Sequence, residues 1–563
     1  MDFVYKQAKK TSPLVRQKYI SDLESLYLEP GVLYVEKLDH LDYLHDEMDA
    51  KRWFLGDIIL LDHEYPDKSK GFFYALTHDP RQNLTEFRSD QHSFLPIYYC
   101  DAGDEIIVSS SAHKIAGMLG AKTENSPFLT QMALFNVPLA DNCFFTEIKR
   151  LPYGCCLRVI NGTLKIEQET RVYDDFLRSP KTFQSALNDT VDIFISNCRQ
   201  YIDQPSSIAL TGGFDSRTIL AVAHTVRSDF DTFTHGKANN NDVKNPKMLA
   251  SELGFDHLLI DLSDQAYVEG KFVGLARQYL RYTAGYNAFL YPHLLYDADL
   301  LSCGSQVMLT GFCGSELLRN AHFGGAITSQ PVIDLLFKGK EYAQNAVKNN
   351  CDYQILGEEY FNDELLQSSF GKLSGYLNEL PDHLSKNQKL AVFEFEEVLP
   401  KLFGSFMYSS MHYIRTRLPF MDSEFYKTLL NSEISQVYRK FMEKNPVKRF
   451  WGQYLYAKIM ERCWPELARL TSSKGYAPAD LLSLRGKYRI IKGFMGKKKR
   501  LERVDYDNLS IISGISNHLE RSEGLINMPL TARELSSLLT NQKKRDLACL
   551  LLSSDEYIRM TNH

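Results

Sequence analysis

The sequence lacks long apolar runs: none of its 563 residues falls in a stretch of about 18 consecutive apolar residues. Its first residues, MDFVYKQAKKTSPLVRQKY, also contain no apolar segment of signal-peptide length. We therefore expect neither a membrane-spanning helix nor an export signal. A cytoplasmic protein without a membrane partner is the expectation that follows.

The sequence also lacks features that are typical of a zinc-binding or a nucleic-acid-binding protein. It has ten cysteines, but no CxxC pair and no Cys/His spacing typical of a zinc site. We expect all ten to be reduced thiols. Lys and Arg total 65 against 70 for Asp and Glu, a formal net charge of −5. This balance argues against a dedicated nucleic-acid partner. Internal repeats and low-complexity segments are absent as well.

The composition that remains is that of an ordinary globular protein, with 44% hydrophobic and 24% charged residues. Up to about residue 180, short β-branched and aromatic runs separated by Gly, Asp and Asn predict a β-rich part. Helices are predicted there at 111–120 and 128–136, because apolar residues recur at helical spacing.

From about residue 182 the pattern changes to alternating helices and strands. A helix is predicted over 183–202, and strands over 230–236 and 257–263 flank a helix near 246–253. Such alternation is typical of a parallel α/β sheet. Beyond residue 331 helical patterns dominate to residue 552.

The most informative segment is Ser207–Ala223, SIALTGGFDSRTILAVA, which is predicted to be a strand, a glycine turn and a helix. Two glycines allow the backbone to approach a ligand closely, and successive N–H groups at a helix start suit phosphates. Because Asp215 would repel bare phosphate, it indicates a bridging magnesium ion. The alternative is a plain strand-to-helix connection, in which the glycines serve geometry and Asp215 caps the helix.

This segment resembles the pyrophosphate-binding loop of asparagine synthetases, whose ATP-pyrophosphatase domain splits ATP to AMP and pyrophosphate. Further stretches resemble the family in its own order, namely RSDQHSFLPIYY, FFTEIKRLPYG, MLTGFCGSE, RLPFMD and KGYAP. The resemblance implies an α/β fold with two domains. Residues 1–180 would form an inactive, β-rich class II glutamine amidotransferase-like domain. An adenine nucleotide alpha hydrolase-like PP-loop domain with a helical C-terminal part would follow over 181–563.

The resemblance also implies roles for individual residues. ATP would be bound by a set of loop residues, and Mg²⁺ by Asp215. Lys474 would stabilise the negative charge that develops during adenylation or acyl transfer. Arg417 and Asp422 are interpreted as architectural residues. One arrangement would be an ion pair between them that stabilises the site. The expected ATP-binding residues are Leu210, Thr211, Gly212, Gly213, Asp215, Ser216 and Gly311.

The sequence departs from the family pattern at several positions. Glutamine-hydrolysing members need a cysteine directly after the initiator Met, whereas residue 2 is Asp2 and the first cysteine is Cys100. We therefore expect no glutaminase activity. In the stretch MLTGFCGSE, which would form a second loop of the site, Phe312 and Ser315 replace polar or acidic residues. Glu316 is therefore the remaining candidate there for a catalytic residue that accepts a proton.

Cys313 is interpreted as a packed thiol rather than a nucleophile. Arg415 stands where the family often has a glutamate, which suggests a different acid substrate or a different site geometry. The basic stretch 485–503 is interpreted as a solvated loop, with contact to an anionic substrate or partner as the alternative.

The functional expectation is an ATP-dependent ligase that adenylates a small-molecule or peptide carboxylate and passes it to an amine or ammonia. A homodimer or a pathway partner protein is compatible with the family. One alternative is a non-catalytic homologue that acts as a scaffold or regulator. A tRNA-modifying PP-loop enzyme is a further alternative, but it leaves the LPYG and RLPFMD segments unexplained.

Overall fold

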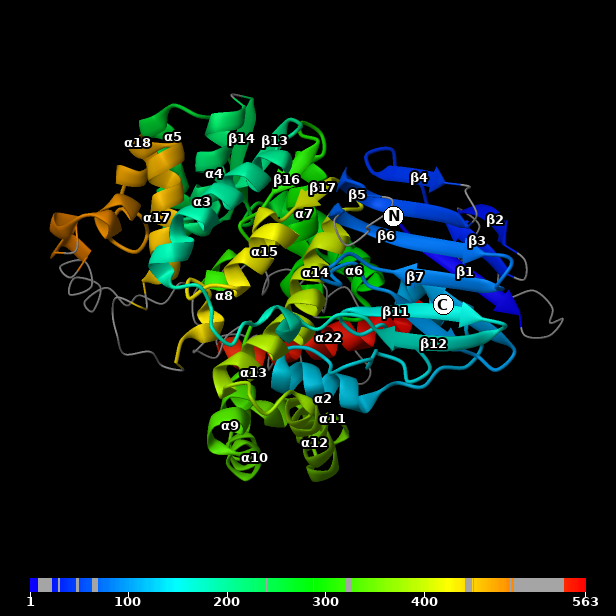
Figure 1. Ribbon diagram of the computed structural model, residues 1–563. Helices are drawn as coiled ribbons and strands as arrows, with labels where there is room; N and C mark the ends of the chain where they lie inside the picture. The colour runs from blue at the N-terminus through cyan, green and yellow to red at the C-terminus, as the bar shows by residue number, and fades with distance from the viewer. Residues whose placement is uncertain are drawn as a thin grey trace.

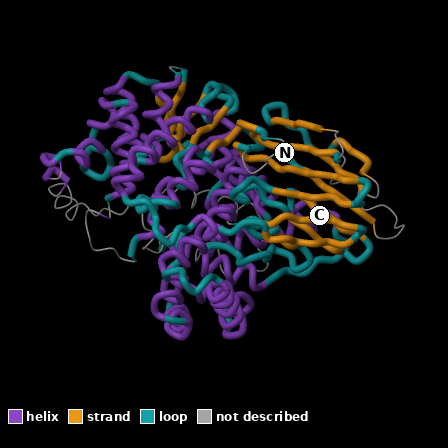
Figure 2. Tube along the Cα trace, viewed as in Figure 1, coloured by secondary structure: helices purple, strands orange, loops and turns teal. Residues whose placement is uncertain are grey.

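The computed structural model describes most of the chain and shows a β-sandwich packed against a helix-covered parallel sheet (Figures 1 and 2). Its described residues are 1–8, 23–28, 31–46, 50–62, 69–227, 229–238, 240–286, 288–318, 327–440, 448, 450–486, 488–490 and 541–562. The basic stretch predicted at 485–503 lies largely outside them. Among the described residues, no helix is both long and apolar enough to cross a membrane.

The N-terminal part is two six-stranded antiparallel sheets. Phe3 of the first sheet contacts Tyr74 and Phe87 of the second, with ring centroids 5.1 and 5.8 Å apart. An aromatic core therefore joins the sheets. The first runs β10 (Lys149–Arg150), β8 (Tyr98–Asp101), β9 (Glu105–Ser109), β1 (Phe3–Ala8), β3 (Gly31–Val35), β2 (Glu24–Leu28). The second runs β12 (Thr163–Gln168), β11 (Cys155–Ile160), β7 (Leu84–Arg88), β6 (Lys70–Asp79), β5 (Lys51–Leu60), β4 (Asp42–Asp46).

The helices predicted in this part are confirmed as α1 (Ala112–Met118) and α2 (Ser126–Phe135). The Ser111 hydroxyl accepts a hydrogen bond from the Lys114 backbone N–H and so caps α1. Proline in the first turn of α2 suits the start of a helix, since that position needs no N–H donor.

The second part contains a five-stranded sheet in which every neighbouring pair is parallel, as predicted. Its order is β15 (His257–Asp261), β14 (Phe230–Gly236), β13 (Ser206–Ala209), β16 (Val307–Leu309), β17 (Arg415–Arg417). From β13 the chain first adds strands on one side and later on the other. This reversal makes the β13/β16 boundary a topological switch point, where open α/β sheets bind ligands.

Helices cover this sheet and extend below it (Figure 1). They are α3 (Phe183–Gln200), α4 (Asp215–Val226), α5 (Asn241–Leu253), α6 (Phe272–Thr283), α7 (Pro292–Leu301), α8 (Gly314–Leu318), α9 (Gln330–Lys338), α10 (Lys340–Lys348), α11 (Gly357–Tyr360), α12 (Asp363–Glu379), α13 (Lys386–Phe393), α14 (Leu399–Ser410), α15 (Ser423–Leu430), α17 (Trp451–Cys463), α18 (Pro465–Arg469) and α22 (Gln542–Asn562). Short 3₁₀ or π turns are η3 (Val172–Asp175), η4 (Ala266–Lys271), η5 (Ala288–Leu290), η6 (Cys351–Leu356), η7 (Glu394–Val398), η8 (Pro419–Met421), η9 (Gln436–Tyr438) and η10 (Pro478–Leu482).

Helix α22 ties the far end of the chain to the N-terminal part. Its Tyr557 is fully buried, and its ring centroid lies 5.0 Å from that of Phe144. The sandwich and the helical part therefore share one continuous apolar core.

A buried ion-pair network also joins the sandwich to the parallel sheet. Asp57 of β5 accepts hydrogen bonds from Arg417 Nε at 2.6 Å, Arg417 Nη2 at 2.9 Å and Arg415 Nη1 at 3.0 Å. Arg417 is thus architectural, but it does not pair with Asp422, which accepts from the Asn197 amide at 2.7 Å. Arg415 is occupied at this interface, so it gives no evidence for a different acid substrate.

Candidate functional site

The glycine loop lies at the carboxyl end of β13, beside the switch point. The Ser216 hydroxyl accepts from the Thr211 backbone N–H at 3.0 Å, and the Thr211 hydroxyl accepts from the Gly213 N–H at 3.2 Å. These bonds close the loop on itself before α4 begins at Asp215. Since these bonds occupy the Thr211 and Gly213 N–H groups, the start of α4 is the part of the loop that would suit an anion. Leu210, at its base, is buried.

A second segment, residues 471–476, lies against this loop. Ser473 donates to the Gly212 carbonyl through both its N–H (3.2 Å) and its hydroxyl (2.9 Å). A Cβ at Gly212 would come within 2.6 Å of the Ser473 Cβ, so only glycine allows this approach. The contact brings Lys474 to the loop, and its Nζ lies 4.3 Å from the centroid of the Phe214 ring. Lys474 and the glycine loop, far apart in the sequence, are brought together.

Arg217 holds this second segment in place from the first turns of α4. Its side chain is fully buried and donates to the Leu470 carbonyl at 3.1 Å and the Thr471 carbonyl at 3.0 Å. A third bond goes to the Asn245 amide oxygen. Burial lowers the pKa of the Arg217 guanidinium to about 10. Sequence reasoning missed Arg217, although its place directly after the loop was a usable signal.

We expect Arg217→Met to release the 470–476 segment from the loop. Three partly exposed acceptors would lose their charged donor, so the free energy of unfolding should fall by about 2–3 kcal/mol. Hydrogen exchange should also become faster in this segment. Arg199→Ala is the control, since Arg199 makes one exposed hydrogen bond from α3. Unchanged exchange in the 470–476 segment of Arg217→Met would contradict this assignment.

The second loop follows β16 and packs against the first. A Cβ at Gly311 would lie 2.9 Å from the Ser216 backbone nitrogen, so glycine is required for this contact as well. The Ser315 hydroxyl donates to Asp215 Oδ2 at 2.7 Å. Gly311, Asp215, Ser216 and Ser315 are therefore gathered at the switch point, as the resemblance implied for the first three.

Phe312 and Cys313 supply no reactive group at this loop. Phe312 packs on Phe403 and Phe406 of α14, with ring centroids 5.0 and 6.0 Å away. Cys313 is fully buried, and burial raises the pKa of its thiol well above the ordinary value. This environment agrees with a packed thiol. Glu316 is half-buried on α8, one residue after Ser315.

The oxygen donors at the loop are of the kind that magnesium prefers. Asp215 provides a carboxylate at the start of α4, and Asp242 Oδ1 lies 3.3 Å from where a Gly212 Cβ would stand. Burial raises the pKa of the Asp242 carboxyl. Two carboxylates beside the glycine loop are donors that would fit a Mg²⁺ ion.

A histidine and aspartate cluster, not anticipated from the sequence, lies at the end of β14. His235 Nδ1 donates to Asp297 Oδ2 at 2.6 Å, and the His235 and His293 ring centroids are 4.8 Å apart. Burial raises the pKa of the Asp297 carboxyl and lowers that of the His293 imidazole. The histidine next to the last residue of the strand FDTFTHG was the available signal.

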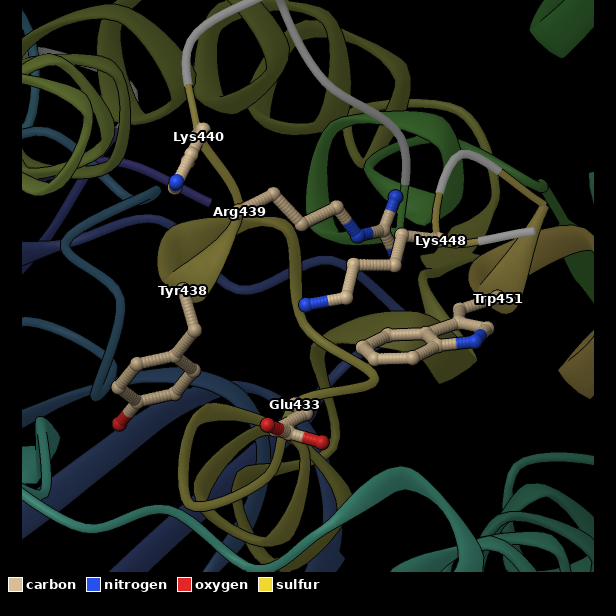
Figure 3. Close-up of a pocket in the computed structure, with 6 residues that line it drawn as sticks. All are labelled: Glu433, Tyr438, Arg439, Lys440, Lys448 and Trp451. Atoms are coloured by element: carbon tan, nitrogen blue, oxygen red, sulfur yellow. The ribbon is translucent and has the colours of Figure 1, made fainter. Parts of the chain in front are cut away.

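A separate small pocket lies between η9 and the start of α17 (Figure 3). Its cavity volume is about 80 Å³, and its lining combines an aromatic ring on each side with three cationic side chains. Its residues are Glu433, Tyr438, Arg439, Lys440, Lys448 and Trp451. None of the predicted site residues lines it.

Comparison with known families adds an independent finding. Residues 196–463 match the family model of asparagine synthase. The matched segment begins within α3 and ends with α17, so it contains the parallel sheet and both loops of the candidate site. Lys474 and the β-sandwich lie outside it. No curated protein matches the chain.

Proposed function

We propose that this chain, which belongs to the asparagine synthase family through residues 196–463, forms amide bonds from a carboxylate at the expense of ATP. Members of this family are ATP-dependent ligases. The proposed reaction produces AMP and pyrophosphate, and the amine is ammonia or the amino group of a substrate. The observation that carries the proposal is the position of Lys474 beside Phe214 of the glycine loop, because the reaction needs a cation near the phosphates.

The first half-reaction joins the acid to the nucleotide. A carboxylate oxygen attacks the α-phosphorus of ATP, the bond to the β-phosphate breaks, and pyrophosphate leaves with the electron pair. The glycine loop and the start of α4 would hold the phosphates, and Lys474 would stabilise the negative charge that develops on them. Bound Mg²⁺, for which Asp215 is the proposed ligand, neutralises phosphate charge.

The second half-reaction makes the amide. The amine nitrogen attacks the acyl carbon, the bond to the AMP oxygen breaks, and AMP leaves with the electron pair. The amine loses a proton in this step, and we expect a residue at the second loop to accept it. Phe312 cannot take it, so Glu316 is the proposed acceptor.

The environment of Asp2 supports a nitrogen source other than the chain's own glutamine hydrolysis. Asp2 is buried, with Lys114 Nζ at 2.7 Å and the Ser110 hydroxyl at 3.2 Å. Although burial opposes ionisation, Lys114 and other neighbours hold the pKa of Asp2 well below its usual range. A fixed carboxylate is no nucleophile for glutamine. We propose that the sandwich is an amidotransferase-like scaffold without that activity.

Nucleotide binding tests this function without knowledge of the acid. We expect wild-type protein to bind α,β-methylene ATP in a calorimetric titration with Mg²⁺, and Asp215→Ala to bind it at least about tenfold more weakly. Asp229→Ala, an exposed carboxylate beyond the other end of α4, is the control and should bind normally. Absence of binding by folded wild-type protein would instead favour a non-catalytic scaffold or regulator.

A further inference from the structure

An aromatic cluster packs against the second loop. Phe312 contacts Phe403 and Phe406, and Phe406 also contacts Tyr291, with ring centroids 4.7 Å apart. Phe403 and Phe406 contact each other at 5.9 Å. We call Phe312, Phe403, Phe406 and Tyr291 the aromatic wall. Its rings come from the second loop, from α14 and from the residue before α7, so only the tertiary fold brings them together.

Phe312 is the member of the aromatic wall that lies next to the phosphate loop. Gly311, directly before it, approaches the Ser216 backbone so closely that a Cβ would lie 2.9 Å from the nitrogen. Ser315, three residues after Phe312, bonds Asp215. The loop that carries Phe312 is thus fixed to the phosphate loop on both sides of the ring.

The burial of the wall is uneven. Phe403 and Phe406 are only 8% and 7% exposed, and Cys313, the neighbour of Phe312, is fully buried. Phe312 is half-buried. The buried rings therefore form the backing of the wall, and Phe312 is the ring that a ligand at the phosphate loop can contact.

The cations on the elements next to the wall pair with carboxylates of the protein itself. Lys401 of α14 pairs with Glu397, and Arg415 and Arg417 of β17 both pair with Asp57. A second carboxylate on a substrate would have to compete with these pairs. Burying such a charge against aromatic rings without a partner is costly. The wall therefore favours a ligand whose body is apolar.

We propose that Phe312 is a specificity-determining residue, which selects aryl- or alkyl-substituted monocarboxylates over dicarboxylates and amino acids. The inference rests on the proposed function and names the substrate class of that site. The reacting carboxylate would lie toward the phosphate loop and Lys474, while the apolar body of the acid packs on Phe312. Contact of this kind favours an apolar acid by about tenfold or more, since each buried methylene contributes to the discrimination.

ATP–pyrophosphate exchange tests the proposal, because it measures activation of the acid before any amine is needed. The apolar acids are phenylacetate and hexanoate, and the polar acids are succinate and aspartate. We expect the wild type to exchange with an apolar acid at a kcat/KM at least about tenfold higher than with either polar acid. Exchange with neither apolar acid, or faster exchange with a polar acid, would overturn the inference. Failure of the wild type to bind α,β-methylene ATP would overturn the proposed function instead.

Three variants assign the preference to Phe312. Phe312→Ala removes the ring, and kcat/KM for the apolar acid should fall about tenfold or more while the ATP analogue binds within a few-fold of wild type. Phe312→Leu keeps an apolar side chain and should keep the preference, which separates loss of the contact from damage to the fold. Phe230→Ala is the matched control, since Phe230 is also half-buried but begins β14 at the opposite end of the sheet. Wild-type acid preference in Phe312→Ala, or loss of the preference in a Phe312→Leu variant that binds the analogue, would overturn the role of Phe312.

Discussion

Replacing Lys474 with alanine is expected to lower the rate of AMP formation by about 100- to 1,000-fold, the usual effect of removing one fixed donor to a developing charge. The fold of the 471–476 segment does not depend on this side chain, because Ser472 and Ser473 anchor it. Ser472 bonds the Tyr476 carbonyl and the Lys474 N–H, and Ser473 bonds Gly212. The variant should therefore fold and still bind ATP within a few-fold of wild type.

The measurement is AMP release with an acid and amine found by screening, together with calorimetric binding of the ATP analogue. Lys448→Ala is a matched control, because Lys448 lines the separate pocket of Figure 3. A variant that binds the analogue normally and releases AMP at the wild-type rate would remove Lys474 from the reaction. Loss of both binding and release would point to a collapsed 471–476 segment.

The parallel sheet and its loop were predictable because each depends on local sequence. The strand, the two glycines and the amphipathic helix lie within Ser207–Ala223, and the structure places β13 and α4 there. Neighbouring strands such as FDTFTHG are short runs that contain aromatic and β-branched residues. The predicted helix over 183–202 likewise corresponds to α3, whose buried residues recur every three or four positions.

Strands whose identity depends on their partners were harder to predict. Strand β17 has the sequence RTR, which does not resemble a buried strand. It is stabilised by pairing with β16 and by Asp57 from another part of the chain. Strand β12 is largely exposed, so it lacks a clear hydrophobic alternation. Both depend on contacts that no window of the sequence contains.

In the candidate site, too, the residues of a local motif were predictable and those with distant partners were not. Gly212, Asp215 and Ser216 belong to one motif and are visible in the sequence. Arg217 acts on groups that are distant in the sequence, since Leu470 and Thr471 lie 253 and 254 residues away. Its role depends on burial, which is set by the tertiary fold. A buried arginine and an exposed arginine are identical letters in a sequence.

Replacing Asp57 with alanine is expected to lower the free energy of unfolding by about 3–5 kcal/mol, the effect of breaking a buried ion pair. Asp57 is fully buried and accepts from both Arg415 and Arg417. Its loss would remove the carboxylate that the two guanidinium groups share, leaving Arg417 with Asp203 and Arg415 with Asp42. Because these arginines belong to β17, next to the strand that leads into the second loop, we also expect AMP formation to fall.

Asp42→Ala is the matched control, since Asp42 bonds the same Arg415 at 2.9 Å but keeps 29% of its side chain exposed. An ion pair of this kind contributes about 1 kcal/mol or less. Urea denaturation of both variants measures the difference, and equal effects would contradict a special role for Asp57. The double variant Asp57→Leu with Arg417→Met should recover part of the loss. It also removes one of the two guanidinium groups that Asp57→Ala leaves without their shared carboxylate. Recovery would show that Asp57 matters chiefly because it compensates the arginines, and a further loss would show that the pair itself stabilises the interface.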